Sequence, residues 1–355
     1  MIIRSRAPVR VSFGGGGTDL SPYCDLYGGV VLNGTITRYI YVTLIPNNSK
    51  KIKIISVDYK KTLKFSNLNE IKFNGDIDLI KAVVLRMKPG YGFDLILRSD
   101  IPPNTGLGSS GAVAVATIGA FNHIRSENKL NKYEIAEMAH KIETEDLSNV
   151  GGRQDQYASV FGGINYMEFF QKDFVRIIPL NVPKDHILEL EKHLVLSFVL
   201  DRGPSGNVQE IMVDQMLNEI RNDNKNKVET LDQLKEYCNK MYESLSKGEF
   251  DTFGLLMHKS WATKRKLSSK ISNKKIDIIY NDARNAGALG GKITGAGGGG
   301  CMIFFCESNQ EHSVSSQLVK SGAEVINFSF DNTGLVTWEI PKNNRNVSTI
   351  SHLNQ

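Results

Sequence analysis

The chain of 355 residues is long enough for two domains with a large buried core, and its 41% hydrophobic and 23% charged residues are typical of a soluble globular protein. The formal net charge of +5 is mild, and the densest basic run, at 263–275, contains no aromatic residue, which favours a solvated helix face over a nucleic-acid site. No apolar run approaches the ~20 residues that span a bilayer, and the first residues lack the apolar core of a signal peptide, so we expect a cytoplasmic protein with no nucleic-acid and no membrane partner.

The cysteines are scattered along the chain and form no CxxC pair, so we expect neither a disulfide framework nor a zinc site. They are Cys24, Cys238, Cys301 and Cys306. The last two lie in an apolar, strand-like run and are predicted to be small core residues.

Strand patterns dominate the first hundred residues, with β-branched and aromatic residues separated by Pro, Asn and Gly. Strands are expected at 9–13, 39–44, 51–57 and 63–65. Helical spacing follows at 111–124 and 132–146, and strands return at 162–167 and 174–180.

The second half begins with a buried strand at 194–200 and continues with helices. Amphipathic helices are expected at 208–220 and 230–246, separated by a charged stretch, and then at 250–267 and 276–286. Strands at 301–305, 324–328 and 335–340 close the chain. Because strands come first, helices later and no regular βαβ alternation appears, the order favours an α+β class over a doubly wound sheet. We divide the chain into an N-terminal domain (1–185), a C-terminal domain (186–345) and a polar tail (346–355).

The most informative segment joins a Pro-Pro turn to a Gly-Leu-Gly-Ser-Ser loop and then to an Ala/Val run at helical spacing. A glycine loop that opens a helix presents unpaired N–H groups and the positive end of the helix dipole, an arrangement that binds phosphate. Gly106 and Gly108 let an anion approach the backbone, and Ser109 and Ser110 add hydroxyls. The alternative is a tight turn capped by serine.

A first glycine cluster, Gly14–Gly17, follows the strand at 9–13 and ends in Thr18 and Asp19. Consecutive glycines form an open loop, and a carboxylate beside bare backbone suits the hydroxyls of a polyol. The alternative is a flexible turn in which Asp19 caps a helix.

A third cluster, Gly295–Gly300, runs into the strand at 301–305. Both this cluster and the middle loop match the spacing G-x-G-x-x-G. A dinucleotide site is nevertheless rejected, because the third cluster precedes a strand and no convincing ribose-binding acid follows the middle loop. A P-loop is excluded because Ile293 follows Lys292, where Ser or Thr is required.

The three glycine loops, in this order, resemble the motifs of the GHMP kinase superfamily of small-molecule kinases. The motifs lie at 6–20, 102–111 and 292–300, and the middle one has Gly111 where Ala is commoner. The resemblance spans nearly the whole chain. It implies a two-domain fold, with an N-terminal domain like that of ribosomal protein S5 and a ferredoxin-like C-terminal domain.

Within the superfamily, residues 6–19 and the Gly-Arg-Gln-Asp-Gln-Tyr segment at 152–157 look like the branch of sugar-1-kinases. The length suits the heptose phosphate kinases, since fucokinases usually carry a large additional domain. The resemblance implies ATP- and Mg²⁺-dependent phosphorylation of the C1 hydroxyl of D-glycero-D-manno-heptose 7-phosphate, giving the 1,7-bisphosphate for surface polysaccharide. The alternatives are an anomeric kinase of the fucose or galactose type, and an inactive regulator that binds nucleotide or sugar.

The resemblance also implies roles for individual residues. Asp155 would accept or orient the proton of the substrate hydroxyl, and Arg10 would lie near it and stabilise developing charge; alternatively, Asp155 caps the next helix. Ser110 and Glu143 would hold Mg²⁺, although Glu143 is otherwise a surface carboxylate, and the choice among Glu143, Glu145 and Asp146 stays open. ATP would be bound by Pro103, Asn104, Gly106, Leu107, Gly108, Ser109, Ser110 and Gly111, and its adenine by residues between about 45 and 100.

The sugar phosphate would lie beside the first and third glycine loops. Asp19 would orient its hydroxyls together with Gly15, Gly16 and Thr18. A substrate that already carries a phosphate needs a cationic clamp, best made by arginine. The candidates for the clamp and for closing the cleft are Arg153, Arg202, Ser205, Gly297 and Gly298. The oligomeric state is left open, with a homo-oligomer as one option.

Overall fold

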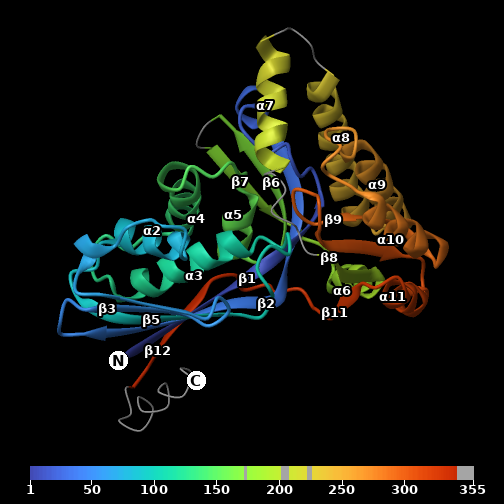
Figure 1. The fold of residues 1–355 in the computed structure, drawn as a ribbon. Coiled ribbons are helices and arrows are strands. Elements are labelled where there is room, and N and C mark those ends of the chain that lie inside the picture. The colour runs from blue at the N-terminus through green and yellow to red at the C-terminus, as the bar shows by residue number, and fades with distance from the viewer. Residues whose placement is uncertain (172–173, 201–207, 222–225, 342–355) are drawn as a thin grey trace.

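The computed structural model describes residues 1–171, 174–200, 208–221 and 226–341, and within them lie two β-sheets, each with its own helices (Figure 1). The larger sheet has the order β12-β1-β2-β5-β3-β4, with β6 paired to β2 and β7 paired to β6. Its strands are β1 (Ile2–Gly14), β2 (Gly29–Asn47), β3 (Ile52–Ser56), β4 (Lys61–Phe65), β5 (Gly92–Ser99), β6 (Ile164–Phe170), β7 (Phe174–Pro179) and β12 (Val336–Ile340).

Strand β1 carries the polar residues Arg10 and Ser12 of the candidate active site. Its apolar residues Val9, Val11 and Phe13 are fully buried in the core. Because successive side chains of a strand point to opposite faces, Arg10 and Ser12 lie together on the other face. The end of β1 therefore presents two polar side chains next to the first glycine loop.

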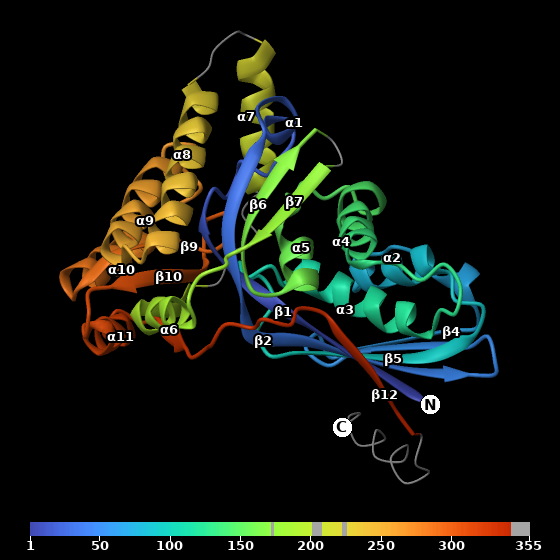
Figure 2. The same ribbon diagram turned by 180° about the vertical axis from the view of Figure 1, so that it is seen from behind.

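Helices cover one face of the larger sheet, as Figures 1 and 2 show. Residues 111–122 of α3 are almost all buried, because its alanines, glycines and valines let neighbouring elements pack closely on every side. The helix α4 begins with a capping box formed by Asn131 and Glu134. The helices of this half are α1 (Tyr23–Tyr27), α2 (Asp78–Met87), α3 (Ser109–Ile124), α4 (Lys132–Lys141) and α5 (Gln154–Phe161).

The smaller sheet is antiparallel and has the order β11-β8-β10-β9. Helix α9 packs directly against β9, where a Cβ at Gly290 would come within 2.1 Å of the Gly254 carbonyl oxygen. The strands are β8 (Leu194–Leu200), β9 (Ala288–Ile293), β10 (Gly300–Cys306) and β11 (Glu324–Ile326). The helices are α6 (Lys184–His193), α7 (Val208–Arg221), α8 (Asn226–Lys247), α9 (Phe250–Lys264), α10 (Lys274–Asn285) and α11 (Glu311–Lys320).

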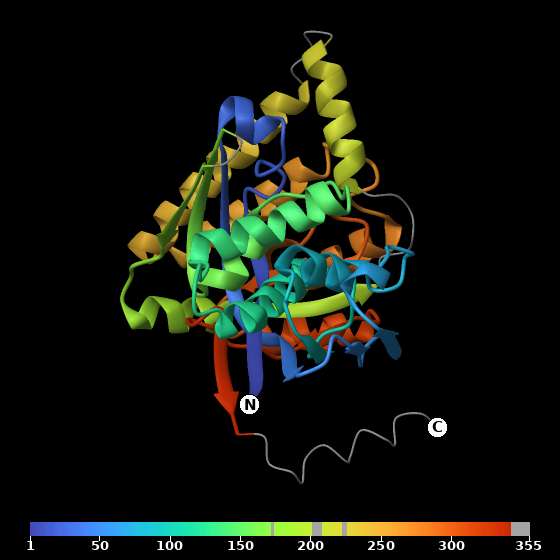
Figure 3. The same cartoon turned by 90° about the vertical axis from the view of Figure 1, so that its left-hand side faces the viewer.

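The chain returns to the larger sheet after completing the smaller one. Strand β12 pairs antiparallel with β1, with Ile2 opposite Ile340 and Arg6 opposite Val336. Figure 3 shows the two strands side by side, β12 in red and β1 in dark blue. The segment 336–340 was assigned by sequence to the second domain, and the structure pairs it with the first sheet.

The predicted α+β class is confirmed, and so is the prediction that Cys301 and Cys306 are core residues, since all four cysteines are free and buried. The elements expected from the sequence did not include α1, α2, α5, α6, α11 and β9. In β9 the pair Gly290–Gly291 hides the strand, because glycine gives no alternation and weakens strand propensity. Among the described residues, no helix has the length and apolar character needed to cross a membrane.

Candidate active site

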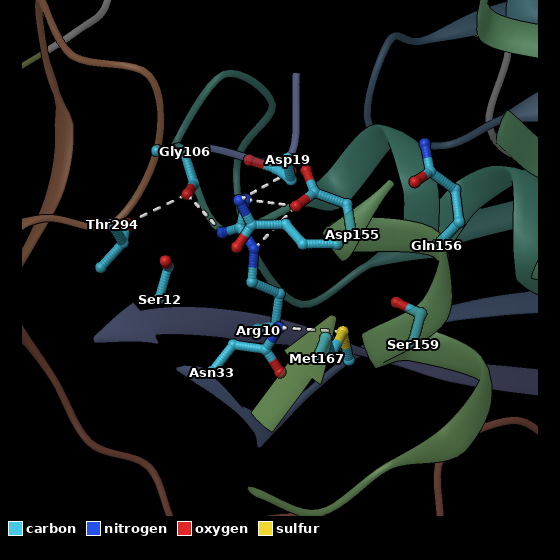
Figure 4. Close-up of polar contacts among 12 residues, drawn as sticks. Arg10, Ser12, Asp19, Asn33, Gly106, Asp155, Gln156, Ser159, Met167 and Thr294 are labelled. Carbon is cyan, nitrogen blue, oxygen red and sulfur yellow. Dashed lines mark hydrogen bonds and ion pairs between the residues drawn. The ribbon is translucent and has the colours of Figure 1, made fainter. Parts of the chain in front are cut away.

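Arg10 and Asp155, 145 positions apart in the chain, form the centre of the site (Figure 4). Nε and Nη2 of Arg10 lie 2.8 and 2.6 Å from Oδ1 of Asp155, and Nη1 donates to the Gly106 carbonyl at 2.7 Å. The Arg10 side chain is only 4% exposed, whereas that of Asp155 is 25% exposed. The guanidinium therefore fixes one carboxylate oxygen of Asp155 and the backbone of the middle glycine loop (102–111), the predicted phosphate loop, at once.

The middle glycine loop is held from both sides. Besides Arg10, the hydroxyl of Thr294 donates to the Gly106 carbonyl at 3.0 Å, and the Cys301 amide donates to the Thr105 carbonyl at 2.7 Å. Thr294 and Cys301 flank the third glycine loop. The two loops touch where Gly106 approaches Gly295, so the second half of the chain helps to fix the phosphate loop.

Two glycines of the middle loop lie tightly against the segment that carries Asp155. Gly108 has φ +72°, and a Cβ there would come within 3.1 Å of the Asp155 carboxyl carbon. At Gly111 a Cβ would come within 3.0 Å of Asp155 Cβ and 3.1 Å of the Gln156 amide. The start of α3 thus lies directly against the start of α5, which brings Asp155 to the phosphate loop.

Two cavities meet at Ser110. The first, of about 340 Å³, lies between the phosphate loop and the α2 region, and its walls include Pro103, Asn104, Ser109 and Ser110. The second, of about 240 Å³, is more polar. Its walls include Arg10, Ser12, Gly16, Asp19, Ser110, Glu143, Gln154, Asp155, Lys264, Thr294 and Gly295.

Asp19 reaches the second cavity from the first glycine loop. Its Oδ1 accepts from the Gly17 amide at 3.1 Å and its Oδ2 accepts from Nε2 of Gln154 at 3.2 Å. Burial, together with the charge of Asp155, raises the pKa of Asp19 above its usual value. Bare backbone is essential nearby, because a Cβ at Gly152 would lie 1.9 Å from Oδ2 of Asp19.

Glu143 lies in a single π-helical turn (Ile142–Asp146) that extends α4. Such a turn shifts the side chains around the helix axis and is frequent at functional sites. Glu143 consequently faces the second cavity, whereas Glu145 and Asp146 contact Arg86 at 3.1 and 2.9 Å. Ser110 and Gln156 hydrogen-bond to the Glu143 carboxyl, and burial raises its pKa to about 7.

The Ser110–Glu143 pair is chemically suited to Mg²⁺. Within the described ranges no cluster of three or more His, Cys, Asp or Glu is placed to hold a metal. Mg²⁺ needs only one or two protein oxygens, since it keeps several waters and the substrate phosphates as ligands. A half-buried carboxyl group with a raised pKa, hydrogen-bonded to a hydroxyl at the start of α3, fits that requirement.

Several residues predicted from the sequence lie away from the second cavity. The Thr18 hydroxyl donates to the Val30 carbonyl at 2.7 Å and accepts from its amide at 3.0 Å, so it fastens the loop to β2. Gly15 also packs against Val30. Gly297 and Gly298 lie against the Ile271 backbone, and the Gly298 amide donates to the Ile271 carbonyl at 2.9 Å.

Of the two predicted clamp arginines, the structure describes only Arg153, and this residue does not line the second cavity. Arg153 is 7% exposed, lies 3.7 Å from Oε2 of Glu137, and borders a neighbouring cavity of about 440 Å³. Arg202 and Ser205 lie outside the described residues.

Lys264 is the functional candidate that the sequence reasoning missed. The run 263–275 was interpreted as a solvated helix face, and Arg265, Lys266, Lys270, Lys274 and Lys275 are not buried. Lys264, however, is 4% exposed, lines the second cavity and donates to the Gly295 carbonyl at 2.9 Å. The signal was available, since Lys264 continues the buried stripe of Phe253, Met257 and Trp261 at helical spacing.

The comparisons with known proteins agree with this geometry. The family model described as the GHMP kinases N terminal domain matches residues 78–163, and the one described as GHMP kinases C terminal matches residues 241–324. The D-glycero-alpha-D-manno-heptose 7-phosphate kinase of Campylobacter jejuni is 36% identical over 343 residues, covering 95% of this chain and 99% of that protein.

Two further relatives match most of this chain. The crystal structure of a D-glycero-D-manno-heptose 1-phosphate kinase from Bacteroides thetaiotaomicron matches with a TM-score of 0.79 at 32% identity, covering 96% of this chain and 99% of that one. The L-fucokinase/L-fucose-1-P guanylyltransferase of Bacteroides fragilis is 28% identical over 346 residues, covering 87% of this chain and 35% of that protein.

This chain belongs to the GHMP kinases, and its site is that of an ATP-using kinase. The family expected from the three glycine loops and the two-domain GHMP fold expected with it are both confirmed.

Proposed function

We propose that the protein transfers the γ-phosphoryl group of ATP to the C1 hydroxyl of D-glycero-D-manno-heptose 7-phosphate, giving the 1,7-bisphosphate. One observation carries the proposal: the Arg10–Asp155 pair lines the second cavity, which meets the first cavity at Ser110, at the start of α3. The similarity to the heptose 7-phosphate kinase over nearly the whole of both chains supports this substrate. We place the reaction in the cytoplasm, where ATP is available.

In the proposed reaction the substrate hydroxyl oxygen attacks the γ-phosphorus as the bond from that phosphorus to the ADP oxygen breaks. Arg10 uses Oδ1 of Asp155 for both of its contacts, so Oδ2 is the oxygen that takes or orients the hydroxyl proton. An anomeric hydroxyl is more acidic than an ordinary alcohol, so a carboxylate held by an arginine is basic enough. The proton then passes to solvent.

The residues around this centre bind and orient the two substrates. The first cavity would take the adenosine part of ATP, and the N–H groups at the start of α3 would hold the phosphates. Ser110 and Glu143 would hold Mg²⁺, which neutralises charge on the phosphates during transfer. Asp19, fixed by Gly17 and Gln154, would accept hydrogen bonds from the sugar hydroxyls.

The decisive experiment is coupled ADP release with Mg²⁺-ATP against a sugar panel. The panel contains D-glycero-D-manno-heptose 7-phosphate, the corresponding 1-phosphate, free heptose, fucose and galactose. We expect turnover with the 7-phosphate and a product phosphorylated at C1. Turnover with free fucose or galactose alone would replace this substrate by a free sugar, and ATP binding without turnover of any sugar would favour a regulator.

A further inference from the structure

The space beside Gly16 is bordered by polar groups from three separate elements. Gly16 lines the second cavity, and the atoms nearest to a Cβ built there are Ser12 Oγ at 3.5 Å, Lys264 Nζ at 3.6 Å and Gln154 Nε2 at 3.9 Å. These side chains come from β1, α9 and α5. All three atoms can donate a hydrogen bond, so the space suits an acceptor oxygen.

Ser12 offers a hydroxyl that the protein itself does not use. The residue is 1% exposed, and among the described residues its buried Oγ has no hydrogen-bond partner. In Figure 4 it stands beside Arg10 with no dashed line to its hydroxyl. A buried polar atom without a hydrogen-bond partner destabilises the fold, and an acceptor oxygen of a ligand would supply that partner.

Lys264 brings a positive charge to the same place from the other half of the chain. Its Nζ donates to the Gly295 carbonyl at 2.9 Å, which holds the ammonium group beside the third glycine loop. Arg10 and Lys264 both line the second cavity. Arg10 is held by Asp155, so the Lys264 ammonium group, 3.6 Å from a Cβ built at Gly16, is the positive charge that an anionic oxygen in this space would meet.

We propose that Lys264 and Ser12 bind a phosphoryl oxygen in the space beside Gly16, with Lys264 as a substrate-binding residue of the kinase. The proposal rests on the proposed function for the identity of the substrates. The oxygen has two sources, the phosphate that the sugar already carries and the phosphoryl group in transfer. Gly16 belongs to the loop that leads to Asp19, the proposed sugar-binding residue. Gly295, which Lys264 contacts, touches the phosphate loop, so the space adjoins the proposed positions of both the sugar and the phosphoryl group in transfer.

The test uses the whole protein with three substitutions and a matched control. Lys264→Met removes the charge and keeps the length of the side chain, and Ser12→Ala removes the hydroxyl. Gly16→Ala fills the space at ordinary contact distances of 3.5–3.9 Å, and its backbone has no positive φ, so the fold accommodates it. Lys266→Met is the control, because this lysine lies two positions away and is exposed.

Steady-state kinetics with heptose 7-phosphate and with free heptose separate the two sources. If the sugar's own phosphate is bound, Lys264→Met and Gly16→Ala raise KM for the 7-phosphate by about tenfold or more and leave KM for ATP and for free heptose unchanged. If the phosphoryl group in transfer is bound, kcat falls by a similar factor with both sugars. Wild-type values in both variants would overturn the proposal.

Binding of inorganic phosphate keeps this test independent of the sugar. We expect phosphate to raise the thermal unfolding temperature of the wild type and of Lys266→Met, and to raise it less in Lys264→Met, Ser12→Ala and Gly16→Ala. If no heptose is turned over but this difference is present, the proposed function fails and the phosphoryl site stands. Equal phosphate protection in all five proteins, with unchanged kinetics, rejects the site.

Discussion

Gly152 lies so close to Asp19 that a Cβ at position 152 would come within 1.9 Å of the carboxylate oxygen Oδ2. The same oxygen accepts a hydrogen bond from Gln154. The segment that carries Asp155 into the site therefore also fixes the Asp19 carboxylate of the first glycine loop. Two motifs more than 130 positions apart in the chain are coupled through a glycine that has no unusual backbone requirement of its own.

The first prediction tests this contact with two adjacent glycines. Gly152→Ala is expected to displace the Asp19 carboxylate and to weaken sugar binding by about 10- to 100-fold, because small misplacements of positioning groups cost that much. Gly151→Ala is the control, since nothing lies within 4 Å of a Cβ there, and neither glycine has a positive φ. Steady-state measurement of KM for the sugar and of KM for ATP in both variants tests this prediction. Equal sugar KM values in the two variants would contradict the predicted role of the contact.

The second prediction concerns stability and pH. Burial and the charge of Asp155 raise the pKa of Asp19 in the folded state above its ordinary value of 3.8. Between the unfolded and folded pKa values the folded state binds more protons, so stability falls as pH rises through this window. Asp19→Asn removes this loss, and Oε1 of Gln154, which has no partner among the described residues, can accept from the new amide.

We therefore expect Asp19→Asn to unfold at a higher temperature than the wild type at neutral pH and to lose this advantage below the window. Sugar affinity should fall by about tenfold or more, because a charged acceptor is replaced by a neutral amide. Thermal unfolding from acid to neutral pH measures the first effect, and calorimetry measures the second. A variant less stable than the wild type at neutral pH would show that the Asp19 charge stabilises the fold.

The third prediction separates the acidic residues of the π-helical turn. Glu143→Gln is expected to raise the Mg²⁺ concentration needed for half-maximal activity, because this carboxyl group is hydrogen-bonded to Ser110 at the start of α3, where the phosphates of ATP are proposed to bind. Glu145→Gln is the control, because Glu145 contacts Arg86 outside the cavity, and Asp146 keeps that arginine paired. Identical Mg²⁺ dependence in both variants would remove Glu143 from the metal site.

The sequence predicted which backbone segments come together at the candidate site better than it predicted where their side chains point. The glycine loops and the residues Arg10, Asp19 and Asp155 could be identified because close approach of backbone to a ligand demands glycine, and because the motifs resemble a known family. What could not be derived is the direction in which each loop residue points. Thr18 faces β2, while Gly297 and Gly298 face the Ile271 backbone, because tertiary packing decides which side of a loop borders a cavity.

Lys264 shows that a pattern of charged residues likewise does not reveal which side chain points into the core. Five of the six basic residues at 264–275 are exposed, as a solvated helix face requires. The sixth lies on the buried stripe of α9, where its burial depends on the third glycine loop that contacts it from another part of the chain. A charged residue in register with an apolar stripe is a signal that counting charges along the sequence overlooks.

The last prediction concerns the proposed base. Asp155→Asn keeps the side-chain shape and an oxygen that can accept from Arg10, so the fold and ATP binding should persist. Turnover at saturating substrates should fall by about 10²–10⁴-fold, because the amide cannot take the hydroxyl proton. Asp277→Asn, which weakens a surface ion pair with Arg265 at 3.0 Å, is the control for loss of an arginine–carboxylate contact. Rapid-quench turnover and ATP titration measure both effects, and an Asp155→Asn variant that keeps the wild-type rate would leave Arg10 as the catalytic group of this pair and Asp155 as its support.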